Sequence, residues 1–498
     1  MEKTAHLQAG FSGKKMALLA SGTLRSFGDL VGGDTTITQS PSGYDEGAFD
    51  LKGKFRLSET TSLTLAHQFF RQVDVPVFHK IRLENFARNH TILQQRQLSY
   101  ARLEASPNWG SAVQKITATA SLHRSGEQRE LQKNGSQTLR FEEDEVTSWG
   151  ASMQAEGKLS EHWQTTTGAE FYFDQVGSER LDTDLGTGAA TSKRGLYPDG
   201  STHASAAIFM LNHWETGKWG FFGGLRFNHF SIRVEDETIG KAHLTPAALV
   251  WNAAILRHLS KKDNLFASFN TGFRAPNVDD LGSLGIVDFR YELPTADLKP
   301  EKTYNFELGW RHRSERLQAE AFVFRNELRD LIARVRVGSD SIAGYPVFQK
   351  ENFEQGYVQG FEIAANWLIF KNISLQSALA WQYGQNVTSS EPLRRIPPVF
   401  GRAGIHFSKN AWSLTLETLA AGKQDRLAAG DKSDNRIPAG GTPGWQEVNV
   451  YGDFEWKWLT LRAGIWNVFN EDYRYHGSGV NGMGRSGSVS LMIQVGKQ

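Results

Sequence analysis

Apolar and polar residues alternate with a period of two along much of the chain. The repeat is clearest in residues 304–311, 459–466 and 488–495. A period of two places successive side chains on opposite faces of an extended strand, whereas a helix needs a period near 3.6. These segments are therefore predicted to be β-strands with one apolar face and one polar or small face. A soluble β-sandwich shows the same alternation, so the repeat alone does not identify the fold.

The connections between the predicted strands alternate in length. Short turns recur, for example at residues 12–15, 215–218 and 408–410. Longer polar or glycine-rich segments lie between them, such as residues 176–202, 275–299 and 337–355. This rhythm predicts about 21 strands, with short turns on one side and long loops on the other. Outer-membrane β-barrels have this asymmetry, whereas a sandwich or a propeller has no reason to segregate its loops.

Tryptophan placement also favours a membrane barrel. Tryptophans near short turns would form an aromatic girdle, with each ring in lipid and each N–H in the headgroup layer. The alternative is aromatic packing at one end of a soluble barrel. The tryptophans within about four residues of a predicted short turn are Trp109, Trp163, Trp214, Trp219, Trp310, Trp367, Trp412, Trp456 and Trp458.

Composition narrows the functional classes. The 498 residues carry a formal net charge of +1, which argues against a nucleic-acid-binding protein, because phosphate contacts need clustered Lys and Arg. The mean hydropathy is low, at −0.43, although 11% of residues are aromatic. A barrel reconciles the two values, because only alternate residues face lipid. The longest apolar stretches, residues 204–211 and 247–256, are far shorter than the roughly 20 residues of a membrane-spanning helix.

No enzymatic motif stands out in the sequence. It contains no cysteine, no Gly-x-Ser-x-Gly elbow, no His-Glu-x-x-His and no phosphate-binding loop. We therefore expect no enzyme, no cofactor and no resident metal site. The acidic run at residues 142–145 is read first as a solvated charged rim and, in second place, as a site for a divalent cation.

Two parts of the chain resemble the barrel of TonB-dependent receptors. The first comprises NLFASFNTGFRAPN (residues 264–277) and DLKPEKTYNFELGW (residues 297–310), and the second is LRAGIWNVFNEDY (residues 461–473), closed by Gly484-Arg485. Smaller similarities are YVQGFE, RIPP and GTPG, which begin at Tyr357, Arg395 and Gly441. Together they extend the resemblance over nearly all of residues 1–498, in the order found in the family.

The resemblance implies a transmembrane antiparallel β-barrel of about 21–22 strands in the bacterial outer membrane. In the family an N-terminal plug fills this barrel. The strand rhythm here begins within the first dozen residues, so the plug and the first barrel strand are expected to be missing from residues 1–498. No signal peptide is visible in residues 1–10, and the last residue is Gln498, where the family usually has an aromatic residue.

Charged residues on the inner face are the candidate functional positions. The alternation of side chains between the two faces of a strand, called parity below, places Arg274 inside the barrel. Pro276 ends the strand that carries it. Arg274 is either a strand-end residue or a contact for a plug or an anionic ligand at the pore mouth. Parity also places Glu307 and Arg311 inside the barrel. An ionised group facing lipid would cost about 2–4 kcal/mol at mid-bilayer. Glu320, Arg325 and Glu362 also fall in strands and are read as interior charges. Together with Glu307 and Arg311, they are expected to pair with one another or with a plug.

The resemblance also bears on haem. In haem-importing members, a Phe-Arg-Ala-Pro box is followed by an Asn-Pro-Asn-Leu box, with a ligating His between them. Residues 296–300 replace the second box here, and no His lies between Asn277 and Leu298. This counts against haem by that route. His79, His90 and His476 fall in predicted loops, where each is either a ligand candidate or a solvated histidine.

The sequence thus predicts the barrel of a receptor for TonB-energised uptake of a metal chelate of the siderophore, haem or cobalamin class. The expected partners are outer-membrane lipid and lipopolysaccharide, a plug domain in the same or another chain, the TonB system acting through that plug, and the extracellular chelate. Two alternatives remain open. One is a passive porin-like channel, and the other is a non-functional or split receptor fragment.

Overall fold

The computed structural model describes residues 1–107, 109–237, 240–282, 285–287, 290–293, 295, 297–342 and 345–496. Residue 296 of the replaced family box and the terminal Lys497 and Gln498 lie outside this described part. Three short helices occur in it: α1 (Phe78–Leu83), α2 (Val278–Gly282) and α3 (Ala429–Lys432). None of the described helices has the length and hydropathy needed to cross a bilayer.

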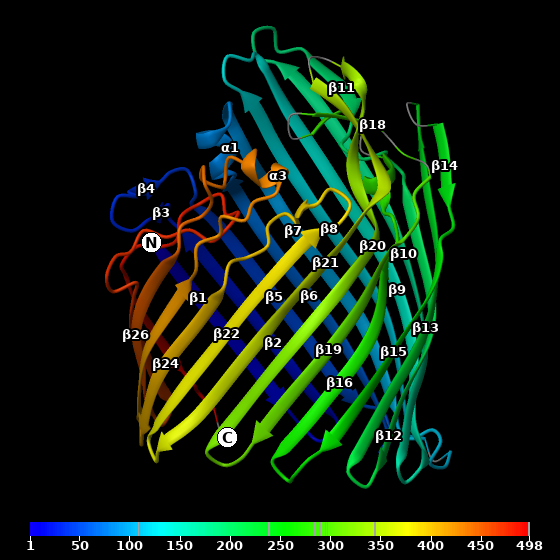
Figure 1. The fold of residues 1–498 in the computed structure, drawn as a ribbon, viewed down its shortest axis with the longest axis vertical. Helices are drawn as coiled ribbons and strands as arrows, with labels where there is room; N and C mark the ends of the chain where they lie inside the picture. Colours follow the sequence, from blue (N-terminus) through cyan, green and yellow to red (C-terminus); the bar gives the residue numbers. More distant parts are fainter. Residues whose placement is uncertain are drawn as a thin grey trace.

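The described strands form a curved wall with the outline of a barrel (Figure 1). Of the 28 described strands, seven short ones lie in the connections and the other 21 form the wall. Each wall strand pairs antiparallel with the next one along the chain, which confirms the predicted fold. The wall strands are β1 (Glu2–Ser12), β2 (Met16–Phe27), β5 (Tyr44–Arg56), β6 (Thr61–Pro76), β7 (Phe86–Ala105), β8 (Lys115–Lys133), β9 (Thr138–Ser160), β10 (Trp163–Asp184), β12 (Thr202–Thr216), β13 (Trp219–Asp236), β15 (Ala247–His258), β16 (Asp263–Arg274), β19 (Glu301–Arg313), β20 (Leu317–Ile342), β21 (Tyr345–Phe370), β22 (Ile373–Asn386), β24 (Phe400–Lys409), β25 (Trp412–Ala421), β26 (Trp445–Trp456), β27 (Leu459–Trp466) and β28 (Ser486–Ile493). The short ones are β3 (Leu30–Val31), β4 (Thr38–Gln39), β11 (Ala190–Arg194), β14 (Gly240–Leu244), β17 (Gly285–Val287), β18 (Arg290–Leu293) and β23 (Glu391–Pro392).

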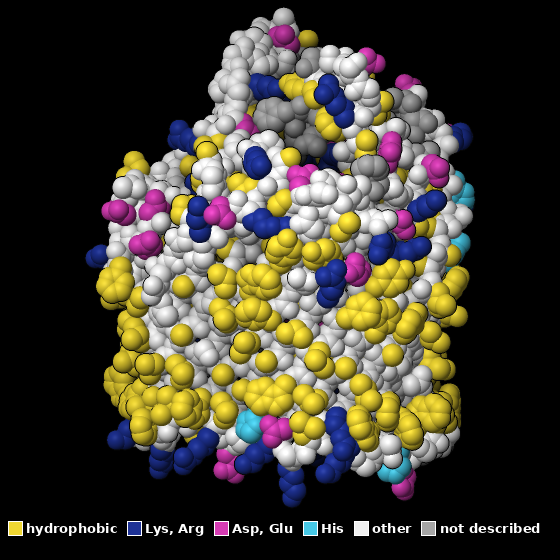
Figure 2. Space-filling model, viewed as in Figure 1, with side chains coloured by type: hydrophobic (Ala, Val, Ile, Leu, Met, Phe, Trp, Pro, Cys, Tyr) yellow, Lys and Arg dark blue, Asp and Glu magenta, His cyan; other side chains and the backbone are white. Residues whose placement is uncertain are grey.

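Strand β19 shows how the alternation builds the wall. Phe306 and Leu308 point outward and are 50% and 55% exposed, which suits side chains that contact lipid. Glu307, between them, pairs across the ladder with Ser268 of β16 on the inner face. The ladders bond backbone groups to one another, as a bilayer requires of any spanning structure. Figure 2 shows the result, a band of apolar side chains between two charged rims.

The two ends of the wall differ in their connections. The short turns all lie at one end, and backbone with positive φ makes them tight. Examples are Gly217 (φ 57°) and Asn410 (φ 56°). The predicted tryptophan girdle lies beside these turns, with Trp163, Trp367 and Trp412 exposed by 42%, 47% and 62%. This arrangement agrees with an aromatic belt at the periplasmic face of a membrane.

Two segments predicted as loops are in part strands. Residues 176–202 include the end of β10 and all of β11, and residues 337–355 include the paired ends of β20 and β21. These hairpin ends rise above the apolar band, where ladder hydrogen bonds form without an apolar face. A small apolar core packs among the raised segments and comprises Val176, Ile232, Val234, Ala242, Val278, Leu281 and Leu298.

A loop–loop clasp connects the first and last parts of the chain. No ladder pairing joins β1 to β28 among the described residues. Above these strands, residues 31–39 bind residues 470–484 instead. Asp34 N donates to the Asn470 carbonyl at 2.9 Å, and Gly484 N donates to the Val31 carbonyl at 2.9 Å. The Thr36 hydroxyl donates to the Asp472 carboxylate at 2.8 Å. The clasp therefore holds the extracellular ends of the wall together.

Asn467 organises the loop that forms half of this clasp. It is 1% exposed, and its side-chain amide donates to the carbonyls of Glu471 (2.8 Å) and Met483 (3.0 Å). Its Oδ1 accepts from Glu471 N at 2.8 Å. Replacing Asn467 with Ala is expected to lower stability by about 1–3 kcal/mol, because buried backbone groups lose their partners.

Thermal unfolding and limited proteolysis of residues 467–485 would measure that loss. Asn366→Ala is the matched control, since Asn366 lies on the inner face of β21 opposite Gln318 and Gln376. Its expected effect is within about 0.5 kcal/mol. Equal stability of the two variants would contradict the role given to Asn467.

Candidate functional site

Most of the predicted inner-face charges lie on the inner wall. Glu307 and Arg311 both point inward from β19. Arg311 pairs with Glu320 of β20, with 3.1 Å between Nη2 and Oε2, and both side chains are exposed to the interior (60% and 42%). Glu307 has no ion-pair partner within the described part of the chain. The expected pairing among the interior charges therefore forms between Arg311 and Glu320, whereas Glu307 is available for a contact inside the barrel.

Arg325 corrects one expectation. It was read as an interior charge, but it lies across the ladder from the outward-facing Phe306. Its charge is balanced by Glu327 at 2.6 Å, and its guanidinium lies 4.0 Å from the ring centroid of Tyr357. Ion pairing and stacking on an aromatic ring let this cation sit on the outer wall at the edge of the apolar band. Glu320 and Glu362 do face inward.

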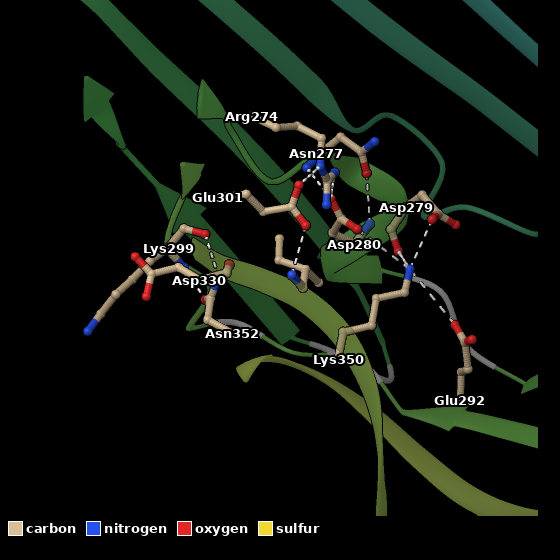
Figure 3. A network of polar contacts seen from close by, with 11 residues as sticks. Arg274, Asn277, Asp279, Asp280, Glu292, Lys299, Glu301, Asp330, Lys350 and Asn352 are labelled. Atoms are coloured by element: carbon tan, nitrogen blue, oxygen red, sulfur yellow. Dashed lines mark hydrogen bonds and ion pairs between the residues drawn. The ribbon is translucent and has the colours of Figure 1, made fainter. Parts of the chain in front are cut away.

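Arg274 binds a folded loop at the mouth (Figure 3). Its Nη1 donates to Asp280 Oδ2 at 2.5 Å, and its Nε donates to Glu301 Oε2 at 2.6 Å. Asp280 is the central residue of α2, and Asn277 N also donates to it at 3.1 Å. Glu301 in turn accepts from Ile332 N of β20 at 2.7 Å. Arg274 thus ties α2 to the ends of β16 and β19, and Glu301 links this group to β20.

Lys350 extends the same network from β21 (Figure 3). Its side chain is 6% exposed and donates to the carbonyl (2.8 Å) and carboxylate (2.9 Å) of Asp279. Its Nζ also lies 3.9 Å from Asp280 and 3.9 Å from Glu292, and Arg334 pairs with Glu292 as well. Several carboxylates and cations thus neutralise one another locally, which is how a protein stabilises buried charges.

We expect the replacement of Arg274 by Gln to loosen this corner of the mouth. Asp280 is 8% exposed, and the loss of its guanidinium partner is expected to cost about 1–3 kcal/mol. Faster proteolytic cleavage within residues 275–299 would report the change. Arg462→Gln is the control, because Arg462 forms an exposed pair with Asp453 that contributes little. A cleavage rate equal to that of Arg462→Gln would rule out the structural role.

A second feature of the mouth is a cavity of about 320 Å³ on the inner wall. Phe400 and Trp445 face inward at the ends of β24 and β26. Both lie across the ladder from Ala421 of β25, which is on the inner face. The loop that follows β27 folds back over them. The lining side chains include Gln382, Phe400, Trp445, Arg474, Tyr475 and His476.

Aromatic rings form one side of this cavity. The Trp445 ring centroid lies 4.6 Å from that of Tyr473, 5.1 Å from that of Tyr475 and 6.0 Å from that of Phe400. Burial raises the pKa of Tyr473, and its hydrogen bond to Glu447 raises it further, so the phenol stays protonated. The surface suits a flat aromatic or conjugated group, which gains from stacking and edge contacts.

Arg474 gives the cavity a positive charge. Burial lowers the pKa of its guanidinium, which nonetheless remains charged near neutral pH. Its Nε donates to Asn481 Oδ1 at 2.5 Å and its Nη1 donates to the Arg436 carbonyl at 3.3 Å, so its bound acceptors are neutral. Among the described residues no carboxylate lies within ion-pairing distance of it. A half-buried cation with neutral partners favours an anionic ligand.

His476 completes the lining with a neutral ring. Burial lowers its pKa below the ordinary value of about 6.5. Its Nδ1 lies 2.8 Å from the Thr442 hydroxyl, and its Nε2 has no hydrogen-bond partner among the described residues. The other predicted candidates lie elsewhere. His79 packs against Gly479, and His90 lies 3.1 Å from Asp74.

A group of ion pairs holds the neighbouring loop in place. Burial raises the pKa of Asp434, but hydrogen bonds from Arg436 and Arg395 outweigh it and hold that pKa well below its usual range. Arg394 also pairs with Asp434, at 3.5 Å, and with Asp431 of α3, at 3.3 Å. These contacts rigidify the segment beside the cavity and so favour a preformed site.

The acidic run has structural partners. In residues 142–145, Glu142 and Asp144 both pair with Arg129 of β8, at 3.2 Å and 2.8 Å. Arg140 adds a further contact to Glu142 at 3.6 Å. Within the described ranges, no group of three or more His, Asp or Glu side chains is arranged to hold a metal ion.

Sequence reasoning identified His476 as a candidate but not the cavity around it. Trp445 and His476 are 31 positions apart in the sequence, and only the folding back of the last long loop brings them together. The run Tyr473-Arg474-Tyr475-His476 was the available signal, since three ring-bearing side chains and an Arg stand together in one predicted loop.

Comparison with known sequences identifies relatives. The family model described as "TonB dependent receptor-like, beta-barrel" matches residues 16–468. A transferrin-binding protein A from Neisseria meningitidis serogroup B is 27% identical over 295 residues, which are 52% of this chain and 31% of that protein. The vitamin B12 transporter BtuB from Photobacterium profundum is 21% identical over 327 residues, which are 65% of this chain and 46% of that protein. The matched region therefore spans less than half of each of these relatives.

Solved structures share the fold. The copper transporter OprC superposes with a TM-score of 0.83, covering 99% of this chain and 79% of its own, at 16% identity. The FrpB iron transporter from Neisseria meningitidis superposes with a TM-score of 0.79, covering 98% and 79%, at 14% identity.

Proposed function

Because this chain belongs to the TonB-dependent receptor family, whose β-barrels lie in the bacterial outer membrane, we propose that it forms the wall and mouth of a receptor for a metal chelate. Uptake is driven by the TonB system, which acts through a plug in the same or another chain. The barrel performs no covalent chemistry. Its contribution is to select the chelate at the mouth and to surround its passage.

The cavity beside Trp445 carries this proposal. It joins an aromatic surface, the unpaired cation of Arg474 and the neutral ring of His476 at the extracellular end of the inner wall. These groups recognise an anionic complex with flat conjugated ligands, because stacking and charge-assisted hydrogen bonds then act together. Several similar proteins are named as transporters of copper, iron or vitamin B12, and these substances are metals or metal complexes.

The inner-wall charges have a second role in the proposal. Glu307, in the middle of β19, and Arg311, near its periplasmic end, face a plug, and the carboxylate of Glu307 is unused. Arg274, whose guanidinium already binds Asp280 and Glu301, contacts a plug or an anionic ligand only through its remaining surface. Plug contacts of this kind break and re-form when the plug moves.

Uptake measurements test the proposal. The natural gene, with any plug-coding sequence that accompanies it, is expressed in cells that lack their own receptors. Cells are then supplied with radioactive iron as catecholate, hydroxamate or haem complexes, or with labelled cobalamin. We expect uptake of one class, and its loss when TonB is deleted. Uptake that persists without TonB would instead favour the passive channel, and no uptake of any class would refute the transport function.

A further inference from the structure

A groove on the outer wall points to a second ligand. It has a volume of about 630 Å³ and lies across β9, β10, β12, β13 and β15. Small residues, among them Ala155 and Ala169, form its floor. Its walls are larger outward-facing side chains: Met153, Ile208, Met210, Leu225, Phe227 and Leu249. A smooth barrel wall needs no such hollow, and an apolar hollow within the bilayer is the right environment for acyl chains.

The same strands carry a cation below the groove. Arg257 of β15 faces outward, across the ladder from Trp219 of β13, and its guanidinium lies 4.3 Å from the Trp219 ring centroid. It has no ion-pair partner among the described residues. Lys218 is exposed on the adjoining short turn, and Glu215 of the same turn lies 3.2 Å from His213. Lys261 and Lys262 stand on the next turn. Arg257, Lys218, Lys261 and Lys262 thus supply cations to the rim below the groove, beside the carboxylates of Glu161 and Asp263.

Aromatic rings and polar groups fill the interval between cation and groove. Trp214 and Phe221 stack with centroids 5.4 Å apart, and Trp219 lies 6.3 Å from Phe221. Above these rings the outer face presents Asn212, whose Oδ1 accepts from Trp163 Nε1 at 3.0 Å, and then the groove begins at Met210. The wall thus changes from cation to indole, to amide, to hydrocarbon within one sector.

We propose that this sector binds one anionic phospholipid of the periplasmic leaflet. The phosphate lies at Arg257 and Lys218, the glycerol esters lie beside Asn212, and the acyl chains fill the groove. The order of chemical groups along the wall matches the order along such a lipid. Short turns mark the periplasmic end of the barrel, which places the cations at the inner-leaflet headgroups. The cations of this rim select a negative headgroup over a zwitterionic one. This site does not depend on the transport function.

Lipid retention tests the proposal. The full chain is placed in nanodiscs of phosphatidylglycerol and phosphatidylcholine in equal amounts, released into mild detergent and analysed by native mass spectrometry. The wild type is expected to retain one phosphatidylglycerol in preference to phosphatidylcholine. Arg257→Gln is expected to reduce that preference about fivefold. Ala169→Leu, which fills the groove floor, is expected to remove the retained lipid altogether.

Two controls keep the test decisive. Ala403→Leu makes the same change on the lipid-facing side of β24, far from the groove, and is expected to retain lipid like the wild type. Protein isolated directly from outer membranes shows which leaflet supplies the lipid. Equal retention of the two lipids by the wild type, equal behaviour of Ala169→Leu and Ala403→Leu, or retention of an outer-leaflet glycolipid in place of phosphatidylglycerol would each overturn the proposal.

Discussion

Replacing Leu308 with Arg is expected to impair assembly of the barrel severely. Leu308 is 55% exposed on the outward face of β19, between the outward-facing Phe306 and Trp310. A guanidinium there enters the hydrocarbon layer, at a cost of up to about 2–4 kcal/mol that falls towards the interfaces. The variant should show a lower midpoint of unfolding in lipid and less folded protein in the outer membrane. Urea titration of folded barrel in vesicles measures both the direction and the size of the change.

The matched control places the same charge on the inner face, at a position next to Leu308 in the sheet. Ser268 of β16 lies directly across the ladder from Glu307 on the inner wall. Ser268→Arg puts the new guanidinium beside an unpaired carboxylate, so its expected effect on stability is near zero or favourable. If Ser268→Arg destabilised the barrel as much as Leu308→Arg, the assignment of the two faces would be wrong.

Replacing Arg474 with Gln is expected to weaken chelate binding about ten- to a hundredfold, the value of a charge-assisted hydrogen bond to an anion. Arg474 supplies the positive charge of the mouth cavity without a carboxylate partner in the described chain. Gln is shorter but keeps an amide donor, and it removes the charge. Titration of the purified protein with the transported chelate, followed by quenching of tryptophan fluorescence, would measure the change.

Arg311→Gln separates this role from a general effect of luminal charge. Arg311 is also on the inner wall, but it is paired with Glu320 and lies near the periplasmic end of β19. Its loss should leave chelate affinity unchanged within about a factor of two, since distant sites behave independently. Equal losses in the two variants would mean that the lumen attracts the ligand as a whole and that the cavity has no special part.

The fold was predictable because it rests on a local signal. Alternation in β19 sets which side chains face lipid, and this fixes the inward direction of Glu307 and Arg311 without knowledge of any neighbour. The alternation of short and long connections then orders the strands. The strand number of 21 followed from the same pattern.

Two kinds of feature escaped prediction. In residues 337–355 the hairpin of β20 and β21 continues above the membrane band, where neither face must be apolar and the period-two signal fades. Arg325 has outward parity but was read as interior, because a charge that faces lipid is costly. Its partners Glu327 and Tyr357 stabilise the cation at the edge of the lipid.

The candidate site escaped for a different reason. Arg274 meets Asp280 six positions later, which is within reach of local reasoning. By contrast, Trp445 meets Phe400, 45 positions earlier, and Tyr475, 30 positions later, only after the last long loop folds over the wall. Contacts of that kind depend on the clasp at Asn467 and Asp472. The alternation of residues along a strand cannot predict such contacts between distant loops.

The location of bound metal in a crystal of the protein with its transported chelate tests the central claim most directly. Anomalous scattering from iron, or from gallium in the same chelate, marks that position without reference to the ligand density. We expect a single peak at the mouth, beside the cavity lined by Trp445, Arg474 and His476. A peak beside the Arg274–Lys350 network, with none at this cavity, would contradict the account.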